Sequence, residues 1–298
     1  MHNKIEILPV SLLESEKSTI NELKAFADEL KLEFGWHYLL DLSWIIRNLD
    51  LIDKQNIIDA GAGTGVMQWY LANKGAKVIS IDRDSRANLN QRFRRRFNIR
   101  GLRESDLDVA SSLSEMKQNR VLKSRLADIV DMLGYKINSS PGTKRENASG
   151  EVIIYNQDLE HLDQIPDDSI DAIVAVSSLE HNSPDGLKRV VAELLRVLKP
   201  GRAIFATLGA AKAEDWFHEA SQGWCYTEST LREVFKISPD IQTNFDQYDR
   251  LFDELRGNKE LKDNLASFYF RSDKNGMPWG EWNPKYQPVG ICKYKESI

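Results

Sequence analysis

Cysteine is scarce in this chain of 298 residues: Cys225 and Cys292 are the only two, and they stand far apart. Without a CxxC pair, neither a disulfide framework nor a zinc site of the usual spacing is indicated. The chain also lacks a run of about 18 apolar residues, and its first residues are not a basic leader followed by an apolar stretch. We therefore expect a protein without a membrane span, residing in the reducing cytoplasm.

An excess of positive charge is also missing, since the formal net charge is -5. This balance argues against a surface that binds nucleic acid or anionic lipid over its whole extent. One segment stands out locally: residues 91–103, "QRFRRRFNIRGLR", hold six arginines. On a helix these side chains would spread over more than one face, which favours a solvated, salt-bridged surface. RNA binding is the alternative interpretation of the same segment.

Short apolar runs alternate with helical patterns through much of the chain. This alternation predicts a parallel sheet with helices on both faces, preceded by two amphipathic helices at 15–31 and 36–49. The expected strands are 56–59, 78–81, 152–155, 171–176 and 203–208, and the expected helices between them are 65–74, 85–97, 185–198 and 228–236.

Two regions depart from the alternation. Residues 101–150 are expected to form an insertion, helical around 113–133 and then a loop, "NSSPGTKRENASG". After Leu208 the chain is irregular and aromatic, and residues 288–294 are expected to form a final edge strand, since their proline and lysine tolerate an edge. We therefore predict an N-terminal helical cap, 1–50, and one large domain, 51–298, whose aromatic C-terminal segment covers 210–298.

The most informative stretch is "NIIDAGAGTG", residues 56–65. A dinucleotide fingerprint places its third glycine three residues after the second, whereas Gly61, Gly63 and Gly65 are spaced one residue tighter. Asp59 precedes them and can accept hydrogen bonds from loop amides or from a ligand ammonium group. The loop therefore favours a cationic nucleoside ligand over NAD, and an NAD-dependent oxidoreductase is disfavoured.

A second carboxylate lies at the end of the next expected strand. Asp82 ends "KVISID", about where an acidic residue binds the hydroxyl groups of a ribose in nucleotide-binding sheets. The alternative is that Asp82 is only a surface residue at the end of a strand. The nearby glycine loop disfavours this alternative.

Four segments in order carry a resemblance: "DAGAGTG", "VISIDRD", "YNQDLEHLDQIPDDSIDAIVAVSSLEH" and "ELLRVLKPGRAIFATL". They resemble the class I S-adenosylmethionine-dependent methyltransferases, in particular the branch with the ubiquinone and menaquinone methyltransferases. The resemblance covers residues 55–210. It implies an α/β, Rossmann-like fold with a mostly parallel, seven-stranded sheet, helices on both faces, N-terminal helices and an insertion before the third strand.

The resemblance also implies S-adenosylmethionine as the cofactor, and roles for individual residues. The glycine loop would hold the methionine part of the cofactor. The residues at the end of the second strand would bind the ribose, and those at the end of the third strand would bind the adenine. The residues after the fourth strand would lie beside the sulfonium. The residues carried over are Asp59, Gly61, Gly63 and Gly65 for the first, Asp82 with Arg83 for the second, Asp158 with Leu159 for the third, and Ser177 with Ser178 for the fourth. The insertion of about 50 residues is longer than the family pattern.

Methyl transfer is an in-line displacement, so much of the acceleration comes from positioning in a water-poor site. A base is needed only for a poorly acidic hydroxyl, and His181, after the fourth strand, is the candidate. A histidine that only packs or caps the next helix fits equally well. We expect Glu180 to face solvent and His37 to pack in the core. No cluster with metal-ligand spacing stands beside the fourth strand.

The acceptor is the least determined part. Trp216, Trp224, Trp279, Trp282 and Tyr286 form either the wall of an acceptor pocket or pins for an irregular C-terminal segment. A hydroxyl or amine on a small molecule, such as a sugar, nucleotide sugar or glycan, is the first hypothesis. An RNA methyltransferase and a cofactor-binding partner protein without catalysis are the alternatives, and the segment "VSSLEH" lacks the Asn/Asp-Pro-Pro-aromatic element of base-amino methyltransferases.

Overall fold

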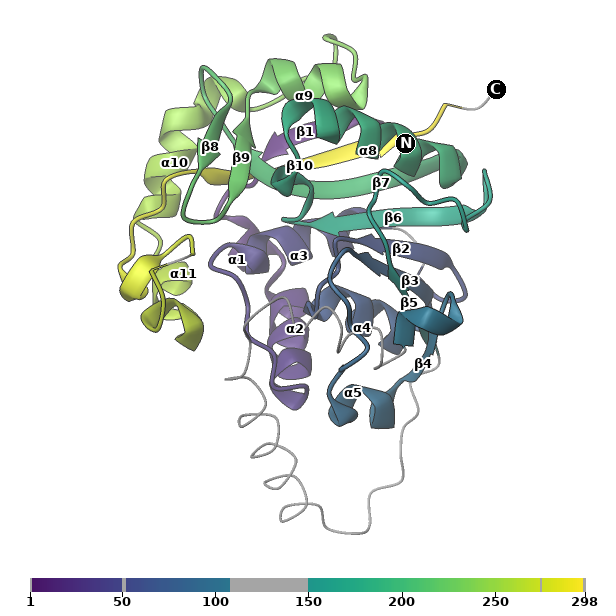
Figure 1. Cartoon of the computed structure of the whole chain (residues 1–298). Coiled ribbons are helices and arrows are strands. Elements are labelled where there is room, and N and C mark those ends of the chain that lie inside the picture. Colours follow the sequence, from purple (N-terminus) through teal and green to yellow (C-terminus); the bar gives the residue numbers. More distant parts are fainter. Residues whose placement is uncertain (1, 50–51, 108–149, 274, 297–298) are drawn as a thin grey trace, which may run out of the picture.

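The computed structural model describes residues 2–49, 52–107, 150–273 and 275–296. The helix expected around 113–133 and nearly all of the loop expected after it lie outside these residues. Within them, one sheet of ten strands runs through the molecule in the order β1-β10-β7-β6-β2-β3-β5-β4, with β8 and β9 attached at the side of β7 (Figure 1). The strands are β1 (Lys4–Ile7), β2 (Asn56–Ala60), β3 (Lys77–Asp82), β4 (Asn98–Gly101), β5 (Glu151–Asn156), β6 (Ile170–Val176), β7 (Leu198–Ala210), β8 (Trp216–His218), β9 (Gly223–Tyr226) and β10 (Gln287–Tyr294).

The centre of the sheet is parallel, as the sequence predicts. β2 pairs with β3 and β6, β5 pairs with β3 and β4, and β6 pairs with β7, all in parallel register. Four consecutive residues are buried in each of β2, β3 and β5. Because successive side chains point to opposite faces of a sheet, this burial means that both faces are covered. The predicted Rossmann-like α/β fold is confirmed, with more strands than the seven expected.

Helices of the described residues provide the cover. α3 packs on β6, β7 and β10, α4 packs on β3 and β5, and α8 packs on β7. The α-helices are α1 (Leu12–Ser15), α2 (Lys17–Glu29), α3 (Tyr38–Asn48), α4 (Val66–Asn73), α5 (Gln91–Arg96), α8 (Pro184–Val197), α9 (Glu228–Phe235), α10 (Tyr248–Arg256) and α11 (Lys259–Asp263). The 3₁₀ turns are η1 (Glu104–Leu107), η2 (Leu179–His181), η3 (Phe245–Gln247), η4 (Ser267–Phe270) and η5 (Pro278–Gly280).

Two expectations for the chain ends are wrong. β10 is not an edge strand, because it lies antiparallel between β7 and β1. The outer strand is β1, so residues 4–7 belong to the sheet and not to a helical cap. β1 is only four residues long, and its alternating pattern, Lys-Ile-Glu-Ile, becomes a strand through pairing with the far end of the chain.

One expected helix is shorter than its pattern. α5 covers 91–96 instead of 85–97, because the side chain of Asn90 caps it by accepting a hydrogen bond from the N–H of Arg92 at 3.0 Å. The residues just before Asn90 form turns. In addition, β4 ends where the expected insertion begins and extends the sheet beyond β5, and η1 occupies the start of the insertion.

The contact of α3 with β10 depends on a glycine. The indole of Trp44 lies against Gly290, and its Nε1 donates a hydrogen bond to Glu6 on β1 at 3.0 Å. A Cβ atom at position 290 would lie 2.6 Å from the Trp44 ring. Such a distance is far inside van der Waals contact, so α3 can lie this close to the sheet only above a residue without a side chain.

We predict that Gly290→Ala lowers the free energy of unfolding by about 1–3 kcal/mol, since the added methyl group overpacks this contact. Urea denaturation measures the change. The matched control is Gly257→Ala at the end of α10, where φ is -78° and the nearest atom to an added Cβ is at 3.4 Å. We expect the control to stay within about 0.5 kcal/mol of the parent, and an equal loss in both variants would contradict the packing argument.

Candidate active site

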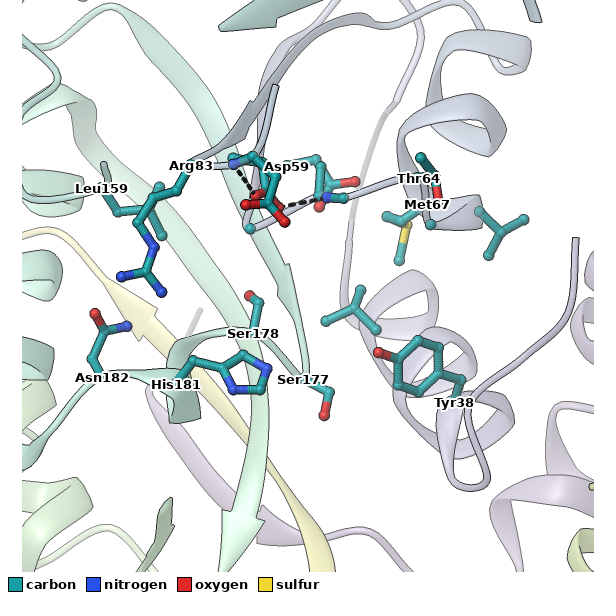
Figure 2. Close-up of a pocket in the computed structure, with 18 of the residues that line it drawn as sticks. Tyr38, Asp59, Thr64, Met67, Arg83, Leu159, Ser177, Ser178, His181 and Asn182 are labelled. Atoms are coloured by element: carbon teal, nitrogen blue, oxygen red, sulfur yellow. Dashed lines mark hydrogen bonds between the residues drawn. The ribbon is translucent and has the colours of Figure 1, made fainter. Parts of the chain in front are cut away.

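A cavity of about 400 Å³ opens at the carboxyl ends of the parallel strands (Figure 2). Its walls come from the loops after β2, β3, β5 and β6 and from α3, which is the position where open α/β sheets bind ligands. The residues that the sequence singled out as cofactor contacts all line this one cavity, together with the candidate base: Asp59, Gly61, Gly63, Gly65, Asp82, Arg83, Asp158, Leu159, Ser177, Ser178 and His181.

The glycine loop owes its shape to two left-handed residues. Gly61 has φ +71° and Gly63 has φ +48°. A Cβ atom at Gly61 would lie 2.5 Å from the Cβ of Ser178, so this position also has no room for a side chain. Gly65 differs, because its φ is -61° and it is the residue that precedes α4. The loop thus presents bare backbone to the cavity.

Asp82 is held by the backbone on both of its oxygens. Oδ2 accepts the N–H of Gly63 at 2.8 Å, and Oδ1 accepts the N–H of Asp84 at 2.9 Å. A carboxylate oxygen has two lone pairs, so each can still accept a hydroxyl hydrogen from a ligand. This arrangement fits a ribose diol, and a side chain at Gly63 would reach within 3.9 Å of Oδ2 and narrow that space.

Asp158 and Leu159 form the next part of the wall. Oδ1 of Asp158 accepts the N–H of Glu160 at 2.9 Å, which closes a small turn after β5. Its Oδ2 lies 3.9 Å from Nη1 of Arg83, a half-exposed pair that adds little to stability but keeps both charges at the cavity mouth. The largely buried side chain of Leu159 offers an apolar surface beside the carboxylate. A flat aromatic ring with hydrogen-bond donors at its edge could pack on Leu159 and donate to the carboxylate of Asp158.

Asp59 is the most unusual carboxylate here, because only 2% of its surface is exposed. Burial raises its pKa to about 7, although the nearby Arg86 opposes the rise. Arg86 is itself buried and donates to the carbonyls of Ser80 at 2.8 Å and Tyr155 at 3.1 Å. Near neutral pH, a cationic group above Asp59 would favour its charged form.

A buried amide supports the loop from below. Nε2 of Gln68 donates to the carbonyls of Gly65 at 3.2 Å and of Ala62 at 3.3 Å, and its Oε1 accepts the hydroxyl of Ser80 at 2.7 Å. Sequence reasoning missed both Gln68 and Arg86. The signal for Gln68 was available, since it is the one polar side chain inside the apolar start of α4, "VMQWYLA". Arg86 carried no such signal.

The two serines after β6 have different tasks. Ser178 donates its hydroxyl to the carbonyl of Ala60 at 2.6 Å and fixes the turn to the end of β2. Ser177 adopts φ +46°, which is rare for a residue with a side chain. Its N–H contacts the carbonyl and hydroxyl oxygens of Thr207 at 3.1 and 3.2 Å, and its own hydroxyl donates to Glu180.

His181 is exposed at the cavity wall, across from Tyr38 on α3 (Figure 2). Its Nδ1 lies 2.9 Å from the carbonyl oxygen of Gln222. A carbonyl can only accept, so Nδ1 carries the hydrogen and the lone pair of a neutral ring lies on Nε2. The ring is therefore in the tautomer that a proton acceptor needs. Tyr38, which the sequence did not single out, stands directly after His37.

Glu180 and His37 can now be placed. Glu180 does not face solvent as expected: only 6% of it is exposed, because the turn packs against β7 and β9, and burial raises its pKa. His37 is buried, as expected, with Nδ1 2.7 Å from Oδ2 of Asp41 and its ring 5.7 Å from that of Tyr286. It is not among the residues that line the cavity.

The aromatic residues near the C-terminus lie away from the cavity. Tyr286 and Trp282 pack on Trp36, with ring centres 5.3 and 5.9 Å apart, and Nε1 of Trp282 donates to the carbonyl of Arg256 at 2.8 Å. Trp216 and Trp224 lie on the β8–β9 hairpin against His218 and Phe217, and Trp279 is 65% exposed. Of the two interpretations, the structure supports aromatics that hold the C-terminal segment in place.

Comparison with known proteins bears on this site. Residues 122–206 match the family model described as a methyltransferase domain. Within the described residues this match spans β5, β6, η2, α8 and the first part of β7, and therefore the third and fourth walls of the cavity. No curated protein matches the chain.

Several solved structures are similar to the chain at low identity. They include the YcgJ protein from Bacillus subtilis (16% identity, TM-score 0.45, covering 87% of this chain and 99% of that one) and a SAM-dependent methyltransferase from Methanosarcina mazei (15%, 0.42, 85% and 98%). A phosphoethanolamine N-methyltransferase from Haemonchus contortus has 12% identity, a TM-score of 0.45, and coverage of 96% and 60%. These distant likenesses add nothing to what the site itself indicates.

The burial of Asp59 predicts a pH dependence of stability. Its pKa is raised when the chain folds, so the folded protein holds this proton between about pH 4 and pH 7 while the unfolded chain releases it. The contribution of Asp59 to stability is therefore complete at low pH and is lost as the pH rises through 7.

We predict that Asp59→Asn, in the absence of ligand, removes this loss and is more stable than the parent at pH 8 by up to about 4 kcal/mol. Chemical denaturation between pH 5 and 8 measures it. Asp263→Asn, an exposed change at the end of α11, should keep the slope of the parent. A slope that is unchanged in Asp59→Asn would show that Asp59 is not the group responsible.

Proposed function

We propose that this chain, a class I methyltransferase that uses S-adenosylmethionine, transfers the methyl group to a hydroxyl or amine of a small-molecule acceptor, with a sugar, nucleotide sugar or glycan as the leading classes. The observation that carries the proposal is the set of carboxylates around one cavity at the strand ends. Asp59 lies below the glycine loop, Asp82 lies at the end of β3, and Asp158 lies in the turn after β5; all three line the cavity. A cationic nucleoside suits this set better than a dinucleotide with its pyrophosphate.

The fit to the cofactor follows from the contacts already described. The bare backbone at Gly61, Gly63 and Gly65, with Asp59 beneath, would hold the methionine part. Asp82 and Arg83 would receive the ribose, and Asp158 with Leu159 the adenine, while Ser177 and Ser178 would border the sulfonium. The bound cofactor supplies an electrophilic methyl group. The task of the chain is to hold the acceptor in line with that methyl group and keep water away.

The remaining wall supports a hydroxylated acceptor. Tyr38, Ser177, His181 and Asn182 bring polar groups to the cavity, next to the apolar side chains of Leu42 and Val176. A concave pocket with a few convergent polar groups is typical of sites for small metabolites. We propose that Nε2 of His181 accepts the proton of the acceptor hydroxyl, since Gln222 fixes its tautomer.

The arginine-rich segment does not favour a nucleic-acid acceptor. Its guanidinium groups are engaged within the protein, so the segment is the salt-bridged surface that its pattern predicts. Arg96 pairs with Glu29 at 2.6 Å, Arg100 with Glu151 at 2.8 Å and Arg103 with Asp106 at 2.8 Å, while Arg94 donates to the carbonyl of Ala87 at 2.9 Å. Phosphate binding would have to break these pairs.

The test of the proposed function is a methyl-release assay with a panel of free sugars, nucleotide sugars, glycans, small amines, quinone precursors and RNA. We expect turnover with a hydroxylated or amine-bearing small molecule and none with RNA. Turnover with RNA alone would overturn the choice of acceptor. Cofactor binding without turnover on any member would favour the alternative of a non-catalytic partner protein.

For the cofactor site, we predict that S-adenosylmethionine and S-adenosylhomocysteine bind and that NADH does not. Asp82→Ala should weaken binding by about 100-fold or more, since two charge-assisted hydrogen bonds to the ribose are lost. Isothermal titration calorimetry measures the affinities, and Asp253→Ala on α10 is the control that should match the parent. Tight binding of NADH without a response to either methionine compound would refute the site.

For the base, we predict that His181→Ala lowers kcat with a hydroxyl acceptor by about 100-fold and leaves the affinity for S-adenosylmethionine unchanged. Steady-state kinetics at saturating substrates measures the change. His161→Ala, which removes an exposed histidine in the turn after β5, is the matched control. Unchanged turnover in His181→Ala would mean that positioning alone suffices.

A further inference from the structure

The hydroxyl of Ser177 is committed to one partner. It donates its hydrogen to Oε1 of Glu180, so the oxygen can offer a ligand in the cavity only its lone pairs. The backbone of Ser177 holds the left-handed φ of +46°, fixed by the contacts of its N–H with Thr207. A non-glycine residue in this region costs about 1–3 kcal/mol and persists where the surroundings over-determine it.

Glu180 is a buried carboxylate that is only partly satisfied. Its Oε2 has no hydrogen-bond partner among the described residues. The titratable groups near it come from three further segments: Tyr38 of α3 with His37 just before it, Cys225 and Tyr226 of β9, and Tyr286 just before β10, besides His181 in its own turn. Burial opposes the charge of Glu180 and raises its pKa, while the nearby His181, the hydroxyl of Ser177 and His37 act in the opposite direction. Burying a carboxylate with one idle oxygen lowers stability, so stability alone does not account for it.

We propose that Glu180, acting through Ser177, is a positioning residue of the acceptor subsite. Ser177 accepts a hydrogen bond from the acceptor, either from an N–H of a reacting amine or from a hydroxyl next to the reacting one, whose own hydrogen goes to His181. The negative charge of Glu180 behind Ser177 compensates positive charge on the acceptor. This inference rests on the proposed function and specifies its acceptor: the group next to Ser177 is a hydrogen-bond donor, and a carboxylate or phosphate is disfavoured there by repulsion from Glu180.

The chemistry of methyl transfer makes such a charge useful. The acceptor atom forms its bond to the methyl carbon while the carbon–sulfur bond breaks and its electron pair returns to sulfur. Positive charge therefore moves from sulfur to the acceptor atom until that atom loses its proton to a base. A fixed negative group on the acceptor side, in a site that excludes water, stabilises the charge where it develops.

The kinetic test uses Glu180→Gln, which keeps the shape and removes the charge, together with Ser177→Ala and the double variant. With an acceptor from the panel, we expect each single variant to lower kcat by about 10- to 100-fold and the double variant to be little worse, since the two residues act as a unit. KM for S-adenosylmethionine should stay within about twofold in Ser177→Ala and rise by no more than about 3- to 10-fold in Glu180→Gln, which loses its attraction to the cation. Glu233→Gln, which changes an exposed glutamate of α9 paired with Lys188, is the control that should match the parent.

The pH profile separates charge from shape. In the parent, activity should fall on the acid side as Glu180 takes up a proton, by about tenfold per pH unit below its pKa. Because protonation of the proposed base would itself give an acid limb, the comparison is made in the His181→Ala background, where Glu180→Gln should lack the limb that Glu180 causes. An acid limb that remains unchanged in Glu180→Gln would overturn the assignment.

A binding experiment needs no acceptor. The charge of Glu180 should favour the cationic S-adenosylmethionine over the neutral S-adenosylhomocysteine, so Glu180→Gln should lower the ratio of their affinities by about 3- to 10-fold. Its thermal unfolding temperature should equal or exceed that of the parent, because a buried charge is removed. An unchanged ratio, or a lower unfolding temperature accompanied by equal losses of binding for both compounds, would reveal a purely structural role.

The two proposals fail in different ways. If no acceptor is methylated while Glu180→Gln still loses its preference for the cation, the proposed function fails and the charge assignment stands. If an acceptor is methylated while Glu180→Gln keeps the kcat, the acid limb and the affinity ratio of the parent, the function stands and the inference fails.

Discussion

The cavity depends on how the end of β3 holds the glycine loop. The N–H groups of Gly61 and Ala62 both donate to the carbonyl of Ile81 at 2.9 Å, and that of Gly63 donates to Asp82 at 2.8 Å. The parallel register that places Ala60 opposite Ile81 brings these groups together. Three successive amides are thereby satisfied without a ligand, and the loop keeps its shape before anything binds. Preorganisation of this kind lowers the cost of ordering a site on binding.

Beneath the loop, ionisable side chains are buried, and removing them from water lowers the stability of the folded protein. Asp59 and Arg86 are both buried near each other, and Nε of Arg86 has no hydrogen-bond partner in the described part of the chain. Glu180 repeats the pattern on the acceptor side. Buried ionic groups of this kind are weak evidence for stability, since well-packed apolar side chains often replace them without loss. Their concentration around one cavity is therefore better explained by ligand binding than by folding.

The sequence predicted the features that are encoded locally. Central parallel strands are buried on both faces and read as continuous apolar runs, and the glycine spacing identifies its loop within ten residues. The sequence could not predict the positions of β1 and β10 in the sheet, the burial of Glu180 or the place of Tyr38 in the cavity wall. Each depends on contacts between distant parts of the chain: Ile5 faces Ile291, and β7 and β9 pack against the turn of Glu180. Exposure of a charged residue in a turn cannot be read from its neighbours in sequence.

This division has a consequence for specificity. The cofactor side of the cavity is built from short segments that each follow a parallel strand, so related chains can share it. The proposed acceptor side joins α3 and the turn after β6, with Gln222 of the β8–β9 hairpin behind His181, and these segments meet only in the folded protein. Asp41 of α3 is buried against Thr207, whose oxygens contact the N–H of Ser177. A change in α3 that shifts Asp41 would therefore move Ser177 and the acceptor subsite while leaving the glycine loop in place, and selection for a new acceptor can act there without rebuilding the cofactor site.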